Sequence, residues 1–226
     1  MNENETHTAV KAVLFDMDGT ILDTLDDLTD AVNYGLRKVH MHERSREEVR
    51  SFLGNGMKVL LSLSAEEGAG PEQMQLFEKE FTSYYMEHCN DRTGPYEGIR
   101  ELMKNLKDAG IKVAIVSNKP HLAVESLSRD YFDGLSDCVI GEQPGLKKKP
   151  APDMVLKALD ALQVSAEEAV YVGDSEVDLQ TARQSKLRCL SVTWGFRSID
   201  SLQKAGASEL FHKPEEIYAF LMKERQ

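Results

Sequence analysis

Short apolar runs alternate with amphipathic stretches along most of this chain. Apolar runs that indicate buried strands occupy residues 10–15, 111–116, 137–140, 169–172 and 188–192, and a shorter run at 209–211 indicates an edge strand. Helical patterns occupy residues 98–108, 122–128, 153–162 and 178–185. This alternation predicts an α/β fold with a doubly wound parallel (Rossmann-like) sheet, which binds ligands at the carboxyl ends of its strands.

One region breaks the alternation. Between residues 24 and 93 we find no strand pattern, and the apolar positions follow helical spacing instead. We therefore predict an all-helical cap domain at residues 23–93. It interrupts a catalytic core formed by residues 1–22 and 94–226, with hinges near residues 23–24 and 94–95.

Composition and charge restrict the possible partners. The chain has 226 residues, of which 41% are hydrophobic and 29% charged, enough to form a core and remain in solution. Its formal net charge of -11 argues against binding to nucleic acid or to an anionic membrane. An anionic substrate would therefore need local cations or a metal ion.

The cysteines and the start of the chain indicate a location. Cys89, Cys138 and Cys189 are odd in number and lack zinc-site spacing, so we expect reduced, buried thiols. The first residues, MNENETHT, do not resemble a signal peptide, and no later stretch is long enough to span a bilayer. We expect a cytoplasmic protein that is a monomer, with a dimer as the alternative.

Two aspartates follow the first strand. Residues two apart in an extended chain point the same way, so Asp16 and Asp18 are expected to face one pocket. Carboxylates that close repel each other unless a cation lies between them or one is protonated. The alternative is a strand-end turn in which aspartate is a capping residue.

Polar groups also follow the next segments of the sheet. Ser117 and Asn118 come after the second strand, where they are suited to hold an oxyanion or, alternatively, to cap a helix. Lys149 precedes Pro150, whose ring stiffens the chain, and is a candidate for a fixed positive charge in the pocket. We interpret the neighbouring Lys147 and Lys148 as part of a solvated loop.

A second acidic pair follows the fourth strand. Asp174 lies at the strand tip and Asp178 lies one helical turn later. Carboxylate oxygens on such a loop suit Mg²⁺, although turn and cap chemistry is again the alternative. Four polar sets in this order, each at a strand end of one sheet, argue against coincidence.

Together these motifs resemble those of a known family. The segments DMDGT, SNKP, KPAPD and GDSEVD are similar to the four motifs of the haloacid dehalogenase-like hydrolase superfamily, and the resemblance covers nearly the whole chain. Residues 23–36 and 52–56 resemble the phosphoglycolate phosphatase branch of that superfamily.

The resemblance implies roles for the core residues. Asp16 would be the nucleophile that forms an aspartyl phosphate, and Asp18 the general acid and then base. Ser117 and the Asn118 amide would hold phosphoryl oxygens, and Lys149 would neutralise the phosphate and the carboxylates. Mg²⁺ would be held by Asp16, by the backbone carbonyl of Asp18, by Asp174 and by Asp178. Asp178 would act either directly or through water.

The same resemblance implies a Mg²⁺-dependent phosphatase for a small phosphorylated metabolite, with phosphoglycolate as the leading substrate. The second aspartate, Asp18, favours phosphate chemistry, because dehalogenases have no leaving oxygen to protonate. A sugar phosphomutase of the β-phosphoglucomutase type, a pyrophosphatase and a catalytically silent phosphate-binding protein are the alternatives. The four intact motifs argue against the last of these.

The cap is expected to select the substrate. Gly54, Asn55 and Gly56 would bring backbone N–H groups near a small anionic group, or else they form a tight turn between two helices. Arg50 and Lys58 flank this loop as possible partners of a substrate carboxylate, with a surface position as the alternative.

Overall fold

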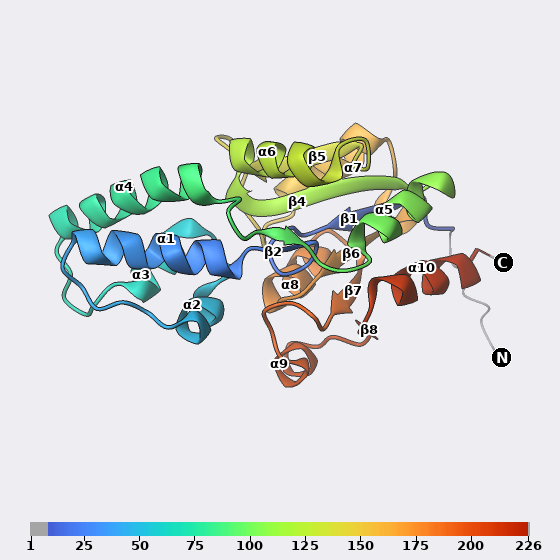
Figure 1. The fold of residues 1–226 in the computed structure, drawn as a ribbon. Coiled ribbons are helices and arrows are strands. Elements are labelled where there is room, and N and C mark those ends of the chain that lie inside the picture. Colours follow the sequence, from blue (N-terminus) through green and yellow to red (C-terminus); the bar gives the residue numbers. More distant parts are fainter. Residues whose placement is uncertain (1–8, 226) are drawn as a thin grey trace.

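The computed structural model describes residues 9–225. Residues 1–8, on which the expectation about a signal peptide rests, lie outside that range. Within it, six strands form one parallel sheet in the order β5-β4-β1-β6-β7-β8 (Figure 1). The predicted parallel α/β sheet is thus confirmed. The strands are β1 (Ala12–Phe15), β4 (Lys112–Pro120), β5 (Cys138–Glu142), β6 (Ala169–Gly173), β7 (Arg188–Val192) and β8 (Leu210–Phe211).

The central strand, β1, is the point where the strand order reverses. The chain runs from β1 to β4 and β5 on one side, and then crosses to β6, β7 and β8 on the other. Phe15 lies beside Ile115 of β4 and Val172 of β6, so the carboxyl ends of these three strands meet. Ligands of doubly wound sheets bind at such a switch point.

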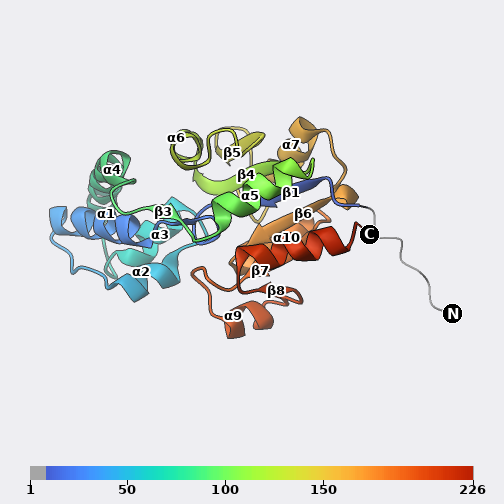
Figure 2. The same cartoon turned by 45° about the vertical axis from the view of Figure 1, so that its right-hand side comes forward.

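Helices cover both faces of the sheet (Figure 2). Val13 and Phe15 of β1 pack in the apolar cluster that includes α5, α6 and α10, whereas Ala12 and Leu14 pack in the cluster that includes α7 and α8. This alternation follows from the two-residue period of a strand. The core helices are α5 (Ile99–Asp108), α6 (His121–Phe132), α7 (Asp153–Leu162), η1 (Ala166–Glu168), α8 (Glu176–Gln184), α9 (Ile199–Lys204) and α10 (Pro214–Lys223).

A helical unit lies between β1 and β4. It consists of α1 (Leu25–Lys38), α2 (Arg46–Phe52), α3 (Met57–Ser64) and α4 (Pro71–His88), whose apolar side chains form a second cluster together with Phe196. The segments that enter and leave it form a two-stranded antiparallel ribbon, in which β2 (Leu22–Asp23) pairs with β3 (Gly94–Pro95). The sequence pattern did not predict this pairing. The division into a core and a cap domain stays a prediction.

Two expectations from composition have different outcomes. Among residues 9–225, no helix is both long and apolar enough to cross a bilayer. The three cysteines are free thiols, in agreement with the expectation, but their expected burial is wrong, since each is only partly buried. Cys89 follows the last residue of α4 and Cys138 begins the edge strand β5, so the fold does not enclose them on every side.

Candidate active site

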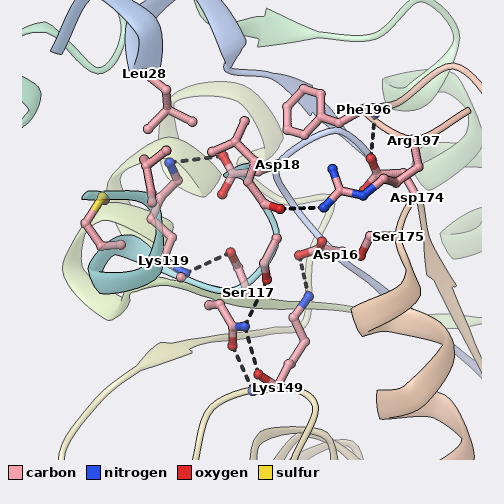
Figure 3. Close-up of a pocket in the computed structure, with 16 residues that line it drawn as sticks. Asp16, Asp18, Leu28, Ser117, Lys119, Lys149, Asp174, Ser175, Phe196 and Arg197 are labelled. Carbon is pink, nitrogen blue, oxygen red and sulfur yellow. Dashed lines mark hydrogen bonds and ion pairs between the residues drawn. The ribbon is translucent and has the colours of Figure 1, made fainter. Parts of the chain in front are cut away.

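The carboxyl ends of β1, β4 and β6 form the floor of a pocket. Asp16, Ser117 and Asp174 line it from the sheet, and Lys149 lines it from the loop before α7 (Figure 3). The helical cap supplies the opposite wall through Leu28, Leu53, Gly54, Gly56, Met57 and Leu60. The cavity between them has a volume of about 50 Å³. The structure thus brings together the core residues that the four motifs singled out.

Asp16 directly follows β1 and has one uncommitted oxygen. Its Oδ1 accepts hydrogen bonds from the Met17 backbone N–H at 2.7 Å and from Lys149 Nζ at 2.7 Å. Within residues 9–225, Oδ2 has no hydrogen-bond partner. The side chain is therefore oriented by one oxygen while the other is free to react with a molecule in the pocket.

Lys149 is a buried cation whose three N–H donors are all engaged. Its Nζ lies 2.7 Å from Asp16 Oδ1, 2.9 Å from Asp178 Oδ1 and 3.0 Å from Tyr171 Oη. Burial lowers the pKa of this ammonium, but the charges of Asp16 and Asp178 outweigh that effect and raise it well above the ordinary value. Lys149 is consequently a permanent positive charge beside Asp16.

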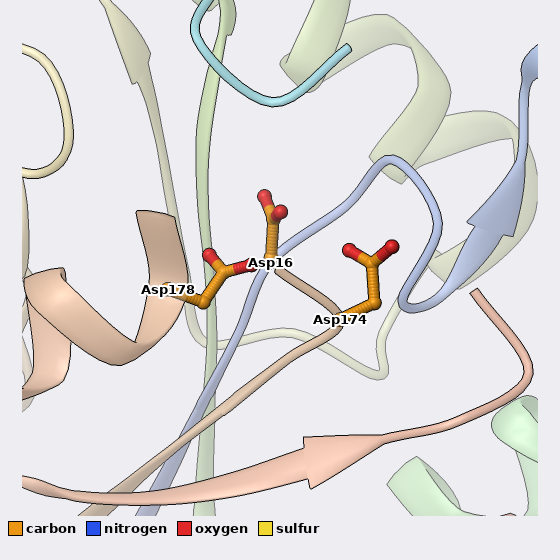
Figure 4. Close-up of side chains that lie close together, drawn as sticks. All are labelled: Asp16, Asp174 and Asp178. Atoms are coloured by element: carbon orange, nitrogen blue, oxygen red, sulfur yellow. The ribbon is translucent and has the colours of Figure 1, made fainter. Parts of the chain in front are cut away.

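Three buried carboxylates lie together at the ends of β1 and β6. One oxygen from each of Asp16, Asp174 and Asp178 lies within 4.8 Å of the others (Figure 4). Asp178 also accepts hydrogen bonds from the backbone N–H and the hydroxyl of Ser175, which forms the cap of α8. Gly173 makes this approach possible, because a Cβ there would lie 2.3 Å from that of Asp178. Asp178 thus belongs both to the cap of α8 and to the group of three carboxylates.

This acidic cluster fits a divalent cation. Burial, reinforced by the charge of Asp178, raises the pKa of Asp16 well above its ordinary value and that of Asp174 to about 7. One lysine cannot neutralise three buried carboxylates, and hard oxygen ligands on short loops are those that a divalent cation prefers. A cation bound here would favour the ionised carboxylates and so oppose both pKa shifts.

We expect the metal-free protein to lose stability as the pH rises. Between about pH 4 and pH 7 the folded protein holds a proton on Asp174 that the unfolded chain releases, so the free energy of unfolding falls across this interval. Asp174→Asn should flatten the fall, and a divalent cation should stabilise the protein more at pH 7.5 than at pH 5.5. Urea unfolding in EDTA measures this, and parallel pH curves for wild type and variant would contradict it.

Asp18 points to a different set of partners. Its Oδ1 accepts a hydrogen bond from Thr24 Oγ1 at 2.7 Å and lies 3.0 Å from Lys119 Nζ. Its carboxylate is not part of the acidic cluster, so only its backbone carbonyl remains a candidate metal ligand, as the resemblance implied. Sequence reasoning missed Lys119, although the residue stands within the SNKP motif.

The segment from Ser117 to Lys119 lies in the irregular end of β4. We expected the strand to end at Val116, but it continues to Pro120, with a shift in its pairing to β5. The Asn118 side chain clamps the backbone of Lys149, accepting from its N–H at 2.8 Å and donating to its carbonyl at 3.0 Å. That side chain is thus committed to position Lys149, which leaves the backbone N–H of Asn118 as the candidate for phosphate. Ser117 is buried and lines the pocket.

The cap loop contacts the core directly. Gly54 and Gly56 have positive φ angles and line the pocket, so the tight turn and the pocket wall are the same structure. Lys148 donates to the Asn55 carbonyl at 3.2 Å, so its placement in a solvated loop is wrong, whereas Lys147 is exposed as expected. Lys148 is half-buried because it contacts the loop around Asn55, and this contact between distant segments leaves no local pattern in the sequence.

Two arginines join this loop to the core. Arg50 donates to the carbonyls of Phe196 at 2.7 Å and Gly195 at 2.9 Å, so it is engaged with the protein. In the opposite direction, Arg197 of the core donates a hydrogen bond to the Leu53 carbonyl of the cap at 2.6 Å. Lys58 is exposed and is not among the residues that line the pocket. Arg197, which sequence reasoning also missed, lines the pocket.

Comparisons with known proteins agree with this geometry. A family model described as "haloacid dehalogenase-like hydrolase" matches residues 13–192. A phosphoglycolate phosphatase of Aquifex aeolicus is 30% identical over 197 residues, covering 85% of this chain and 89% of the relative. A candidate pyrophosphatase, PpaX, of Caldanaerobacter subterraneus is 32% identical over 196 residues, covering 86% of this chain and 87% of that protein.

A solved structure is similar over almost the full length. The crystal structure of a candidate phosphoglycolate phosphatase from Lactobacillus delbrueckii subsp. bulgaricus aligns with a TM-score of 0.90 and 38% sequence identity. The alignment covers 95% of this chain and 99% of that chain, so it includes both the sheet and the helical cap.

Proposed function

This chain belongs to the haloacid dehalogenase-like hydrolase family, and we propose that it is a Mg²⁺-dependent phosphatase acting on a small phosphomonoester. The observation that carries the proposal is the arrangement at Asp16. Asp16 has a carboxylate oxygen with no hydrogen-bond partner among residues 9–225, and it lines a pocket beside a buried ammonium and a cluster of carboxylates. These are the parts that phosphoryl transfer requires, namely a nucleophile and groups that neutralise charge.

In the first step, Asp16 Oδ2 attacks phosphorus and the bond to the leaving oxygen breaks. Lys149 orients Asp16 and favours its ionised form, and the Ser117 hydroxyl with the Asn118 backbone N–H is suited to hold the phosphoryl oxygens. The cation, held by Asp16, Asp174, Asp178 and the Asp18 carbonyl, would supply charge neutralisation and polarise a phosphoryl oxygen.

Asp18 is the candidate acid and base. It lines the pocket next to Asp16, so a rotation of its side chain away from Thr24 brings its carboxyl group toward the leaving oxygen. It would donate a proton to that oxygen, and then accept one from the water that attacks the aspartyl phosphate and releases phosphate.

The pocket favours a small substrate. A cavity of about 50 Å³ has room for only a few water molecules, and apolar cap residues such as Leu28, Leu53 and Met57 close it from above. Phosphoglycolate fits these limits and is the leading substrate, in line with the Aquifex aeolicus relative. Pyrophosphate is a second candidate, which the similarity to PpaX supports. The cytoplasmic location and the monomeric state stay predictions.

A panel of substrates tests this proposal. With Mg²⁺, we expect phosphoglycolate to be hydrolysed with a catalytic efficiency at least about tenfold above that for hexose phosphates, because each poorly accommodated group costs about 1–3 kcal/mol. Phosphate release measures the rates. A preference for hexose phosphates would contradict the proposed size limit.

The phosphomutase alternative predicts a different product from the hexose phosphates of the same panel. A mutase would convert glucose 1-phosphate into glucose 6-phosphate, whereas the proposed hydrolase would release only free sugar and phosphate. Formation of the 6-phosphate as the main product would therefore replace the phosphatase proposal.

A further inference from the structure

The pocket contains a second buried ammonium that the proposed reaction does not use. Lys119 lies in the irregular end of β4, two residues after Ser117, and its side chain lines the same pocket as Asp16. It is only 4% exposed. Lysine is almost never buried in this way without partners, so its placement calls for a reason.

Lys119 has fewer protein partners than its donors allow. Its Nζ lies 3.0 Å from Asp18 Oδ1, donates to Tyr85 Oη, and stands 4.7 Å from the centroid of the Tyr85 ring. An ammonium carries three N–H donors. Among residues 9–225, only Asp18 and Tyr85 accept a hydrogen bond or ion pair from Lys119, which leaves one donor for a molecule in the pocket.

The other cations of the pocket are already committed. Lys149 uses all three donors on Asp16, Asp178 and Tyr171. The Arg197 guanidinium uses four of its five N–H donors, on the Glu176 carboxylate and on the backbone carbonyls of Arg50 and Leu53, and is thereby fixed between the cap and the core. Among the described residues that line the pocket, Lys119 is thus the ammonium with a donor to spare.

The position of Lys119 separates it from the phosphoryl site. Figure 3 shows Lys149 approaching Asp16 and Lys119 approaching Asp18 from different sides of the pocket. The cap side of the pocket that Lys119 lines is apolar, with Leu28, Met57 and Leu60 among the lining residues. An ion pair formed in such surroundings is stronger than one in water, and the chain's net charge of -11 gives no general attraction for anions.

We infer that Lys119 determines specificity by binding a second anionic group of the substrate, at the side of the pocket away from Lys149. This inference rests on the proposed phosphatase function and narrows its substrate to a phosphate ester or anhydride with a short, negatively charged tail. A carboxylate and a second phosphoryl group share this chemistry. The small cavity, about 50 Å³ in volume, favours a short tail between the phosphorus and the second anion.

The test compares Lys119→Met with wild type on phosphoglycolate, pyrophosphate and ethyl phosphate, all with Mg²⁺. Methionine keeps much of the side chain's length and removes its charge. We expect kcat/KM to fall on the order of 100-fold for the substrate with the anionic tail, because a charge-assisted hydrogen bond is lost. Ethyl phosphate should lose less than about threefold. Whichever of the first two substrates shows the selective loss identifies the second group as carboxylate or phosphoryl.

Controls separate recognition from a structural role. Lys119→Arg keeps the charge and should retain most of the discrimination, and Lys147→Met alters an exposed lysine of similar chemistry and should change nothing. If Lys119→Met does not fold, Lys119→Gln takes its place, and the readout is the inhibition of its aryl phosphate hydrolysis. From wild type to Lys119→Gln, phosphonopropionate should then lose more inhibitory potency than propylphosphonate, which has the same length but no carboxylate.

Two results would overturn the inference without touching the phosphatase proposal. The first is an equal loss on all three substrates, which would mean that Lys119 supports Asp18 or the cap and does not read the substrate. The second is a wild-type enzyme that hydrolyses ethyl phosphate better than both anionic substrates. A wild type that hydrolyses no phosphate ester would instead reject the proposed function itself.

Discussion

Asp16→Asn is expected to reduce the hydrolysis of an aryl phosphate by on the order of 10⁴-fold or more, because the amide oxygen is a poor nucleophile and losses of this size follow removal of a nucleophile. The reason is geometric: Asp16 lines the pocket, its Oδ1 is held by Met17 and Lys149, and its Oδ2 has no hydrogen-bond partner among the described residues. Steady-state phosphate release with Mg²⁺ measures the effect.

Stability provides the control for this variant. Asparagine removes one charge from a buried cluster in which Asp178 and Asp174 repel Asp16, so the metal-free variant should unfold at the same temperature as wild type or higher. Lys149 keeps a charged partner in Asp178. Activity within tenfold of wild type would contradict the assignment of Asp16, and a large loss of stability would mean that the lost activity reports unfolding.

Lys149→Met should be the second most damaging change. It leaves Asp16 and Asp178 without their buried counter-charge, and breaking a buried ion pair in this way costs about 3–5 kcal/mol of stability. We also expect kcat/KM for an aryl phosphate to fall on the order of 10³-fold, since one charge-stabilising group is worth roughly 10²–10³. Urea unfolding in EDTA and steady-state kinetics measure the two effects.

The matched variant is Lys147→Met, two residues earlier in the same run of lysines. Its side chain is exposed, so both stability and activity should stay near wild type. Equal effects of the two substitutions would show that the wrong lysine has been assigned to the pocket.

The parts of the fold that follow from local pattern were predictable. Apolar runs gave the strands of the sheet to within a few residues, and α7 was predicted at its observed bounds. The β2–β3 ribbon was not, because two-residue strands that contain Gly94 and Pro95 carry no periodicity. The extension of β4 to Pro120 was missed for a similar reason, since SNKP is typical of a loop.

In the site, too, some residues were predictable from local pattern and others were not. Asp16, Ser117 and Asp174 were predicted because each lies at or near a strand end, where the topology of a doubly wound sheet gathers ligand-binding groups. Lys149 was predicted from the proline that follows it and from the resemblance of KPAPD to a family motif. The setting of Lys119 depends on Tyr85 in α4, which is 34 residues away in sequence, and on the way the cap lies over the core. Contacts of that kind are set by tertiary packing, which a single sequence does not display.

Asp16 is expected to become covalently phosphorylated during turnover. This can be measured by mixing the Mg²⁺-loaded enzyme with excess phosphoglycolate or aryl phosphate, quenching in acid within the first turnovers, and mapping the phosphoryl group by peptide mass spectrometry. We expect a phosphoryl group on Asp16 that is absent from Asp16→Asn. Turnover without a phosphorylated peptide, or a phosphoryl group on another residue, would contradict it.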